Sequence, residues 1–264
     1  MDKFKDLSPD QQKFIHELEI KDTKTIIEWE NFFLPLALFD RKGDFLRSAG
    51  CFFKTFFGLI IFFSVVFIGF YLIKGEEMTN LIIPAVAIVV SILLLTGANQ
   101  YYKEYEDRDI PNPLRSFFVP FLELLKQQSA GKSMMELAID LNSMSDLNDK
   151  KAVDKTTDRF TYLSLLVKLP DSGILNLKIG AHGIKETDHY KLTHAIIFSL
   201  TYDGNNYQLG EEEGPFEILE NQEKIVLQNK YAEHSRSKVE DDPGPDYHIF
   251  RETYTAMHGA IKKK

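Results

Sequence analysis

Two long uncharged runs, separated by a short polar segment, dominate the hydrophobic pattern of this chain. The first extends from Thr55 to Ile73 and the second from Leu81 to Ala98. At about 1.5 Å of rise per helical residue, each run is long enough to cross a hydrocarbon core of ~30 Å. Pro84 lies in the first turn of the second run, where its missing N–H costs little. We therefore predict a membrane hairpin of two transmembrane helices within residues 53–99.

Basic residues near the ends of the two runs predict the orientation of the hairpin. Lys and Arg cluster before the first run and after the second, whereas the connecting segment contains only Lys74. Cytoplasmic flanks of transmembrane helices carry an excess of these residues. We expect a multi-pass membrane protein with both termini cytoplasmic and the loop Lys74 to Asn80 outside. The basic residues concerned are Arg41, Lys42, Arg47, Lys54, Lys103, Arg108 and Arg115.

The composition of the two runs bears on their role. They lack internal charged residues and histidines, which ion pathways and proton relays usually need, so transport is disfavoured. Both runs contain small residues that permit close helix contact. These are Gly58, Gly69, Ala87, Ser91 and Gly97.

The second half of the chain follows a period of two, which is typical of strands with one buried face. The turn residues Pro170 to Gly173 separate two such stretches and predict a β-hairpin. Connections this short exclude helical crossovers, so the strands should be antiparallel. We predict an α+β cytoplasmic domain dominated by an antiparallel sheet, folded as a sandwich or an open barrel. The stretches are 135–141, 161–169, 175–179, 190–202, 207–209 and 225–231.

Helical patterns flank the hairpin and close the chain. Ser8 and Pro9 form an N-cap and first-turn pair, and a second helix is expected to begin near Asp22 or Thr23. Its apolar residues between Ile26 and Phe39 favour a position in the membrane interface, with packing against the cytoplasmic domain as the alternative. A last amphipathic helix, capped by Asp246, should contain Tyr247, Phe250, Tyr254, Met257 and Ile261.

These patterns divide the chain into four parts. Residues 1–52 form a cytoplasmic or interfacial amphipathic arm, and residues 53–99 form the transmembrane hairpin. A linker helix, opened by Pro111 and Pro113, lies within residues 100–127. The cytoplasmic β-rich domain covers residues 128–264.

The charge and the cysteine content of the chain narrow the classes of binding partner and the cellular compartment. Residues 105–264 contain 20 Lys and Arg against 26 Asp and Glu, a net charge of −6. Nucleic-acid binding depends on clustered Lys and Arg, and no long basic stripe is present, so no nucleic acid is expected. The only cysteine, Cys51, excludes an intrachain disulfide and suits a reducing compartment. The expected partners are the lipid bilayer and either another protein or further copies of the chain.

Candidate chemistry is sparse. Four residues, His182, Glu186, Asp188 and His189, are the best candidates for a metal site, but their spacing is poor and no cysteine joins them. His194 lies on an apolar strand face and is interpreted as a core histidine with a hydrogen-bond partner. The segment Gly131, Lys132, Ser133 lacks the first glycine of a phosphate-binding loop. We therefore expect no metal and no cofactor, and we identify no catalytic residue.

Three functions are compatible with this layout. The leading one is a membrane-anchored β domain that acts as an interaction or scaffold subunit of a membrane complex. The second is a ligand-sensing effector whose hairpins cluster, and the layout is similar to membrane effectors in which a ligand-binding barrel drives clustering. The third is a membrane-tethered hydrolase. A closed barrel with a polar pocket would favour sensing, and a solid packed core would favour the anchor.

Overall fold

The computed structural model describes residues 4–74, 79–106, 110–129, 131–142, 160–185, 190–210, 214–220, 223–234, 242 and 244–264. The chain divides into two compact units. The helical unit comprises Met1–Phe4 and Leu38–Asp109, and the β unit comprises Lys5–Ala37 and Ile110–Lys264. The β unit is therefore assembled from sequence on both sides of the helical unit.

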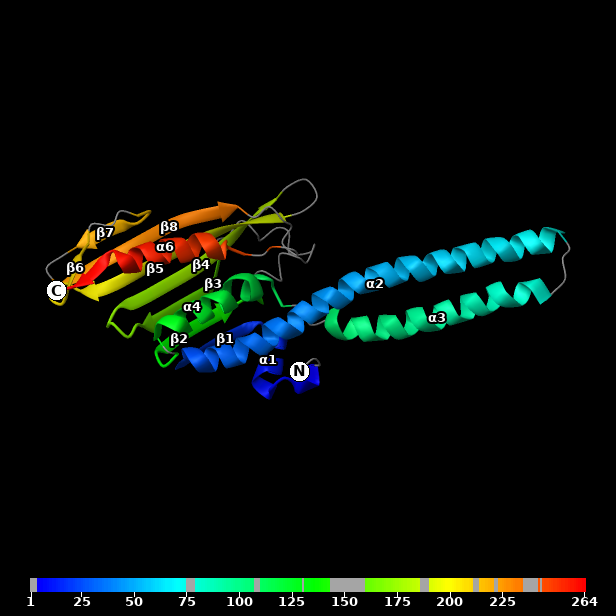
Figure 1. The fold of residues 1–264 in the computed structure, drawn as a ribbon, viewed down its shortest axis with the longest axis horizontal. Coiled ribbons are helices and arrows are strands. Elements are labelled where there is room, and N and C mark those ends of the chain that lie inside the picture. The colour runs from blue at the N-terminus through cyan, green and yellow to red at the C-terminus, as the bar shows by residue number, and fades with distance from the viewer. Residues whose placement is uncertain are drawn as a thin grey trace. The chain divides into compact units, whose positions relative to one another are not determined.

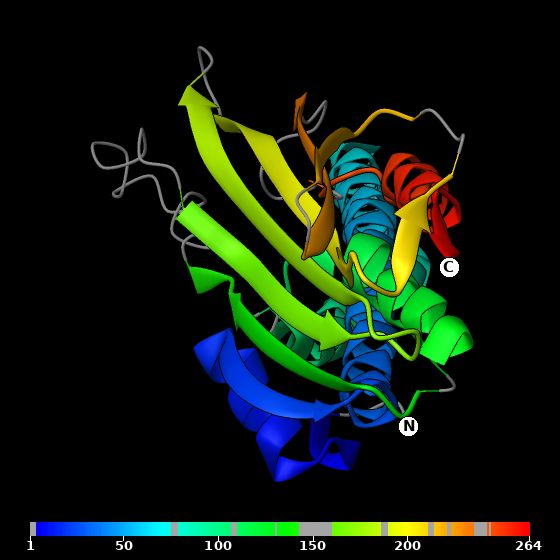
Figure 2. The ribbon, with the colours of Figure 1, turned by 90° about the vertical axis from the view of Figure 1, so that its left-hand side faces the viewer.

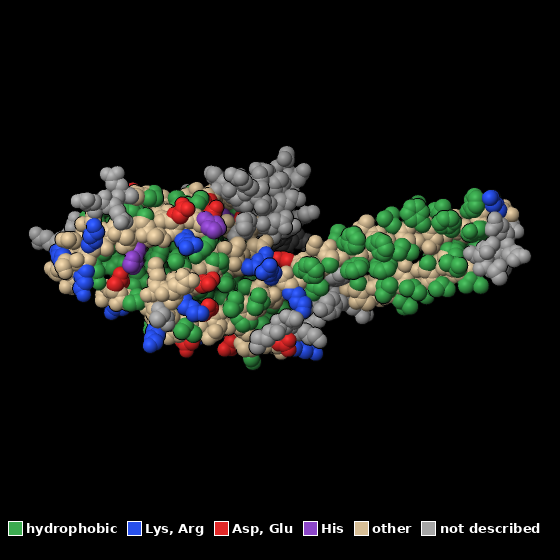
Figure 3. Space-filling model, in the orientation of Figure 1, with side chains coloured by type: hydrophobic (Ala, Val, Ile, Leu, Met, Phe, Trp, Pro, Cys, Tyr) green, Lys and Arg blue, Asp and Glu red, His purple; other side chains and the backbone are tan. Residues whose placement is uncertain are grey.

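Two helices form the helical unit. Helix α2 (Ile26–Lys74) begins in the β unit and continues into the helical unit, and α3 (Thr79–Glu106) follows it. Both contain a stretch long and apolar enough to cross a membrane, with a mean hydropathy of 2.7 in each case. Figure 3 shows their surfaces covered by hydrophobic side chains. By length and composition, the structure thus supports two candidate membrane spans.

The contact between the two apolar helices differs from the one expected. Ser64 of α2 and Ser91 of α3 are buried. Gly58, Gly69 and Gly97 have open space where a side chain would begin. Small buried residues let helix backbones approach closely. Of the small residues named from the sequence, Ser91 is buried in this way, whereas the three glycines face outward.

Seven antiparallel strands form the main sheet of the β unit, in the order β1-β2-β3-β4-β5-β8-β7 (Figure 1). Strands β2 to β5 are neighbours in chain order, and β3 and β4 are joined by the short turn that the sequence predicted, whereas the helical unit separates β1 from β2. A separate two-stranded sheet pairs β6 with β9. The strands are β1 Glu19–Thr25, β2 Met134–Asp140, β3 Phe160–Lys168, β4 Ile174–Lys185, β5 Tyr190–Asp203, β6 Tyr207–Leu209, β7 Glu217–Glu220, β8 Lys224–His234 and β9 Ile261–Lys263.

Helices cover one face of this sheet, which we call the inner face (Figure 2). Helix α4 (Val119–Ser129) and helix α6 (Tyr247–Gly259) meet over it through aromatic rings. The ring of Phe250 lies 5.2 Å from that of Phe121 and 4.9 Å from that of Phe198 on β5. Inner-face side chains are almost fully buried, and they include Met135, Leu137, Ile139, Leu165, Val167, Leu175, Leu177, Ile179, Ile196, Phe198, Leu200, Ile225 and Leu227.

The predicted helix caps are confirmed. The Oγ of Ser8 accepts a hydrogen bond from the backbone N–H of Gln11, and the Gln11 side chain accepts one from the Ser8 N–H, so α1 (Pro9–Glu17) begins with a capping box. The carboxylate of Asp246 accepts a hydrogen bond from the His248 N–H and caps α6. These local signals need no tertiary partner, which explains why the sequence alone identified them.

The amino-terminal arm differs from the favoured expectation. Residues 19–25 form strand β1, paired with β2, and α2 begins only at Ile26. The side chains of Ile26, Trp29, Phe33 and Leu36 are fully buried, and the indole Nε1–H of Trp29 donates to the Met135 carbonyl at 3.0 Å. These apolar residues pack in the β unit, which was the alternative to the membrane interface.

The segment expected as a linker is part of the core. A π-helix, η2 (Leu114–Phe118), leads directly into α4. The apolar side chains of η2 and α4 pack against the apolar inner face of the sheet. The fully buried residues are Phe117, Phe118, Phe121, Leu122 and Leu125. The β unit thus resumes at Ile110 rather than at residue 128.

Two further differences concern the sheet and the end of the chain. Ile261, expected in the last helix, lies in β9, because α6 ends at Gly259. Strand β7 was not anticipated. Within the described residues, the seven strands form one open sheet with β1 and β7 at its edges, so the antiparallel sheet is confirmed and the predicted sandwich or open barrel is not.

The second face of the sheet, which we call the open face, carries exposed side chains. They alternate with the buried inner-face residues along β2, β3, β4, β5 and β8. Aliphatic residues are among them, with Leu166 on β3 45% exposed and Ile197 on β5 41% exposed. Helices α4 and α6 lie on the inner face, whereas α1 lies beside the edge strand β1 (Figure 2). The open face is therefore a broad surface of mixed polar and aliphatic character.

Candidate functional site

A β-bulge in β3 turns a tyrosine into the interior. Thr161 pairs with Gly180 and Leu163 with Ile179, so Tyr162 is an extra residue with no opposite partner on β4. A side chain at Gly180 would begin 2.7 Å from the Phe160 carbonyl oxygen, so glycine permits this close approach. Bulges commonly redirect a side chain in this way. Tyr162 is consequently buried beside Leu163 instead of alternating with it.

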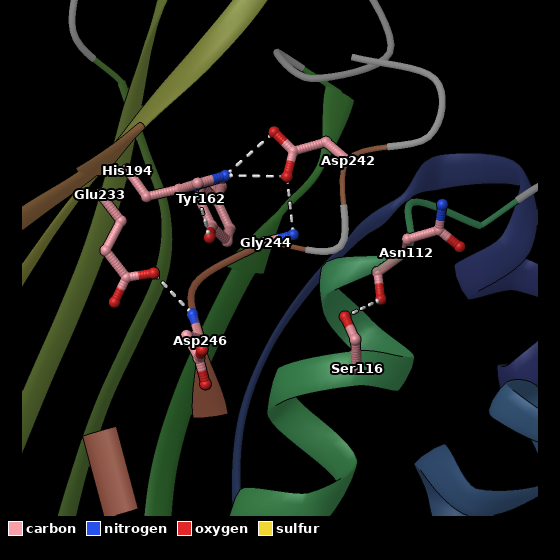
Figure 4. A network of polar contacts seen from close by, with 8 residues as sticks. All are labelled: Asn112, Ser116, Tyr162, His194, Glu233, Asp242, Gly244 and Asp246. Carbon is pink, nitrogen blue, oxygen red and sulfur yellow. Dashed lines mark hydrogen bonds and ion pairs between the residues drawn. The ribbon is translucent and has the colours of Figure 1, made fainter. Parts of the chain in front are cut away.

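Tyr162, His194 and Asp242 form a continuous hydrogen-bonded network (Figure 4). His194 lies on the inner face of β5, with Nδ1 3.2 Å from the Tyr162 hydroxyl. Its Nε2 lies 3.2 and 3.1 Å from the two carboxylate oxygens of Asp242. All three residues are at most 2% exposed. The network therefore joins β3, β5 and the segment before α6 inside the core.

Burial of Tyr162 decides whether its hydroxyl or His194 Nδ1 donates the hydrogen bond between them. Loss of hydration, and then the nearby carboxylates of Asp242 and Glu233, raise the pKa of Tyr162 well above that of a free tyrosine. The phenol therefore stays protonated and donates to Nδ1 of His194. This assignment leaves the proton on Nε2, which donates to Asp242.

Asp242 also fixes the chain that leads into α6. Its Oδ1 accepts a hydrogen bond from the Gly244 N–H at 2.7 Å. Gly244 has φ of +80°, and a side chain there would begin 2.7 Å from Cβ of Pro113. Two residues on, the Asp246 N–H donates to Oε2 of Glu233 at 2.6 Å. The network thus clamps residues 242–246 against the sheet and positions the first turn of α6.

Next to this clamp, two buried polar atoms are unsatisfied. Among the described residues, neither the Tyr231 hydroxyl nor Oε1 of Glu233 makes a hydrogen bond of good geometry, although the two groups lie close enough for the phenol to favour the carboxylate. Burial, followed by repulsion from Asp246, raises the pKa of Glu233, although the Asp246 N–H, His194 and the Tyr231 hydroxyl oppose this shift. The ionised form of Glu233 is therefore disfavoured in the folded protein.

Glu233→Gln is expected to stabilise the β unit at neutral pH, by less than about 1 kcal/mol because solvent partly screens this carboxyl group. The folded state keeps the Glu233 proton to higher pH than the unfolded chain, so the unfolding free energy falls as pH rises above the ordinary glutamate pKa of about 4.3. Glutamine has no such pH dependence and still accepts from Asp246. Urea unfolding at several pH values, followed by the fluorescence of buried Trp29, measures the effect.

The difference between the two proteins should shrink to nearly zero at about pH 3, where glutamate is almost fully protonated in both states. Glu217→Gln, on exposed β7, makes the same charge change and should alter stability little. A Glu233→Gln protein less stable than wild type at neutral pH would show that the folded protein favours the ionised carboxylate.

A second polar cluster joins the β3–β4 turn to α6. Oδ2 of Asp171 accepts from the Tyr202 hydroxyl at 3.0 Å and lies 3.2 Å from Nε2 of His258. The Tyr207 hydroxyl donates to the Asp171 carbonyl. Burial, followed by Asp171, raises the pKa of Tyr202. Every polar contact here is made within the fold, so the cluster serves to fasten the turn.

A hollow of about 450 Å³ lies between α1 and β1. Most of its lining side chains are charged. Lys24 lies 2.7 Å from Asp22, and Lys13 lies 3.7 Å from Glu17, so opposite charges largely neutralise one another. This leaves little net charge to select a ligand. The lining is completed by Asp10, Phe14, Glu19, Ile20 and Lys21.

The candidates named from the sequence have different outcomes. His182 lies on β4, on the same side as the open face, and Glu186, Asp188 and His189 lie outside the described residues. Within the described part of the chain, no group of three potential ligands is placed to hold a metal ion. His194 is a core histidine with partners, as predicted. Its partners were missed, because Asp242 lies 48 residues away and Tyr162 enters the core through the bulge.

Comparisons with known proteins add no relative. The chain matches no family model, no curated protein and no solved structure.

Proposed function

We propose that this chain is a membrane-anchored interaction subunit. The two apolar helices span the bilayer as a hairpin, and the β unit lies at the cytoplasmic face, where it binds a protein partner or further copies of the chain. Both termini are cytoplasmic, and residues 74–80 face outward.

One observation carries this proposal: the open face of the sheet is exposed, whereas the inner face is packed beneath helices. Seven strands present a broad surface on which aliphatic side chains such as Leu166 and Ile197 remain accessible. Exposed apolar groups gathered on one face are typical of protein interaction sites. A β domain without a binding partner would not need exposed aliphatic side chains on this face.

The packed inner face favours this role over ligand sensing. A sensor would need a closed barrel around a polar pocket, but β1 and β7 are free edges of an open sheet. Large apolar side chains such as Phe198 and Phe250 fill the interior. Hydrolysis has less support, because the Tyr162–His194–Asp242 network is buried and serves as a clamp.

Affinity capture from mild detergent tests the proposal. Tagged full-length protein, solubilised from its native membrane, should carry a stoichiometric protein partner or form a homo-oligomer. A variant with Leu166 and Ile197 both replaced by glutamate should lose the interaction, since buried charges oppose docking. Wild-type protein that remains strictly monomeric and free of partners would contradict the proposal.

A further inference from the structure

The centre of the open face is basic, unlike the second half of the chain as a whole. Residues 105–264 carry a net charge of −6, yet the open-face residues within β3, β4 and β8 include four exposed lysines. Lys224 lies opposite Asp203 at the end of β5, and we call the other three, Lys168, Lys178 and Lys230, the open-face lysines. The acidic side chains on this side lie toward the flanks, on β2 and β7, as with Glu136 and Glu217, and at the end of β5, as with Asp203. The centre of the face is thus a basic patch on an acidic domain.

The register of the sheet arranges two of these lysines around an aliphatic residue. Lys178 lies directly opposite Ile197, and Ile197 lies directly opposite Lys230 on the next strand. Neighbouring strands are about 4.8 Å apart, so the two lysines are separated by about 10 Å across the sheet. Lys168 lies opposite Ile174 in another row and repeats the pairing of lysine with isoleucine.

The open-face lysines have no acidic partner within the described structure. This differs from Lys126, whose Nζ lies 2.7 Å from a carboxylate oxygen of Glu30. Three exposed cations without partners, set among aliphatic side chains, form a surface complementary to carboxylates that alternate with apolar groups. Such a surface both attracts an acidic partner and offers apolar area for it to bury.

The chemistry of the face distinguishes an acidic protein from other anions. Single-stranded nucleic acid is held by aromatic side chains on which bases stack, and the described open-face positions of β2, β3, β4, β5 and β8 carry none. Membrane-surface binding usually adds interfacial tryptophan or tyrosine, which are absent there too. The net negative charge of the domain also opposes broad contact with anionic lipid.

We propose that the open face binds an acidic protein surface, with Lys178 and Lys230 pairing with carboxylates on either side of the apolar contact at Ile197. This inference rests on the proposed interaction function and names the partner's chemistry. The affinity of this contact falls as ionic strength rises, because the pairs are exposed.

Binding of a defined acidic peptide to the full-length protein tests the inference. A fluorescent peptide of alternating glutamate and valine is titrated with protein held in neutral detergent, and its anisotropy is measured. The Lys178→Glu/Lys230→Glu variant should bind at least about tenfold more weakly, because like charges then face each other. Lys132→Glu, an exposed site in the loop before β2, is the matched control and should leave the affinity unchanged.

Further probes separate the alternatives. A peptide of alternating glutamine and valine should bind poorly, as should vesicles containing phosphatidylserine and a single-stranded oligonucleotide. The inference is overturned if the acidic peptide does not bind wild type, if the double variant binds it equally well, or if only vesicles or oligonucleotide bind. A partner that the double variant still captures from native membrane would leave the interaction function standing and remove this surface from it.

Discussion

His194→Ala is expected to lower the free energy of unfolding of the β unit by about 3–5 kcal/mol, because it leaves the Asp242 carboxylate buried without its main partner. Both side chains are at most 1% exposed, so water cannot replace the lost hydrogen bonds without opening the core. Tyr162 would also lose its acceptor. Urea titration of the full-length protein, followed by the fluorescence of Trp29, the only tryptophan, measures this loss.

Two controls test the cause. His248→Ala removes an exposed histidine near the start of α6 and should change stability by less than about 0.5 kcal/mol. Adding Asp242→Asn to His194→Ala should recover part of the loss, since the unpaired group is then uncharged. A loss below about 1 kcal/mol for His194→Ala alone would show that the Asp242 charge is stabilised by other groups.

Labelling of single cysteines in intact cells should divide cleanly between the two sides of the membrane. In a Cys51→Ser background, Glu77→Cys should react with a membrane-impermeant thiol reagent, whereas Lys132→Cys should react only after the cells are permeabilised. The expectation follows from the basic residues that flank the two apolar helices, since moving those flanks outward opposes the usual charge bias. Glu77 lies outside the described residues, and Lys132 is exposed in the β unit.

Each variant is also labelled after unfolding, where its cysteine should react. This control distinguishes protection by the membrane from burial of the cysteine within the folded protein. Labelling of Lys132→Cys in intact cells, with Glu77→Cys protected, would invert the proposed topology. Equal labelling of both sites would exclude a hairpin that returns to its starting side.

The strands that the sequence identified are those with one buried and one exposed face. In β2, β3, β4, β5 and β8 the apolar inner-face residues recur at every second position, so the pattern itself reports the fold. The turn at residues 170–173 and the caps at Ser8 and Asp246 were also local enough to be recognised. Each of these features depends on neighbours within a few residues.

Features that depend on distant partners could not be predicted. Strand β1 contains one apolar residue, Ile20, and pairs at an edge of the sheet, so it lacks alternation. The apolar stripe of residues 26–39 looks the same whether it meets lipid or a sheet. The site depended on the bulge at Tyr162 and on Asp242, whose role is set by its position opposite His194.

The interrupted sequence of the β unit has a consequence for its biosynthesis. The Trp29 side chain donates a hydrogen bond to the carbonyl of Met135, 106 residues later. Strand β1 likewise cannot pair until β2, at a similar distance along the chain, has been synthesised. Closing so long a loop in a free chain carries a substantial entropic cost. A hairpin already inserted in the bilayer, with both ends on one side, would shorten the effective loop. Insertion would then act as an intramolecular folding aid, preparing the two halves of the β unit to meet before the last strands leave the ribosome.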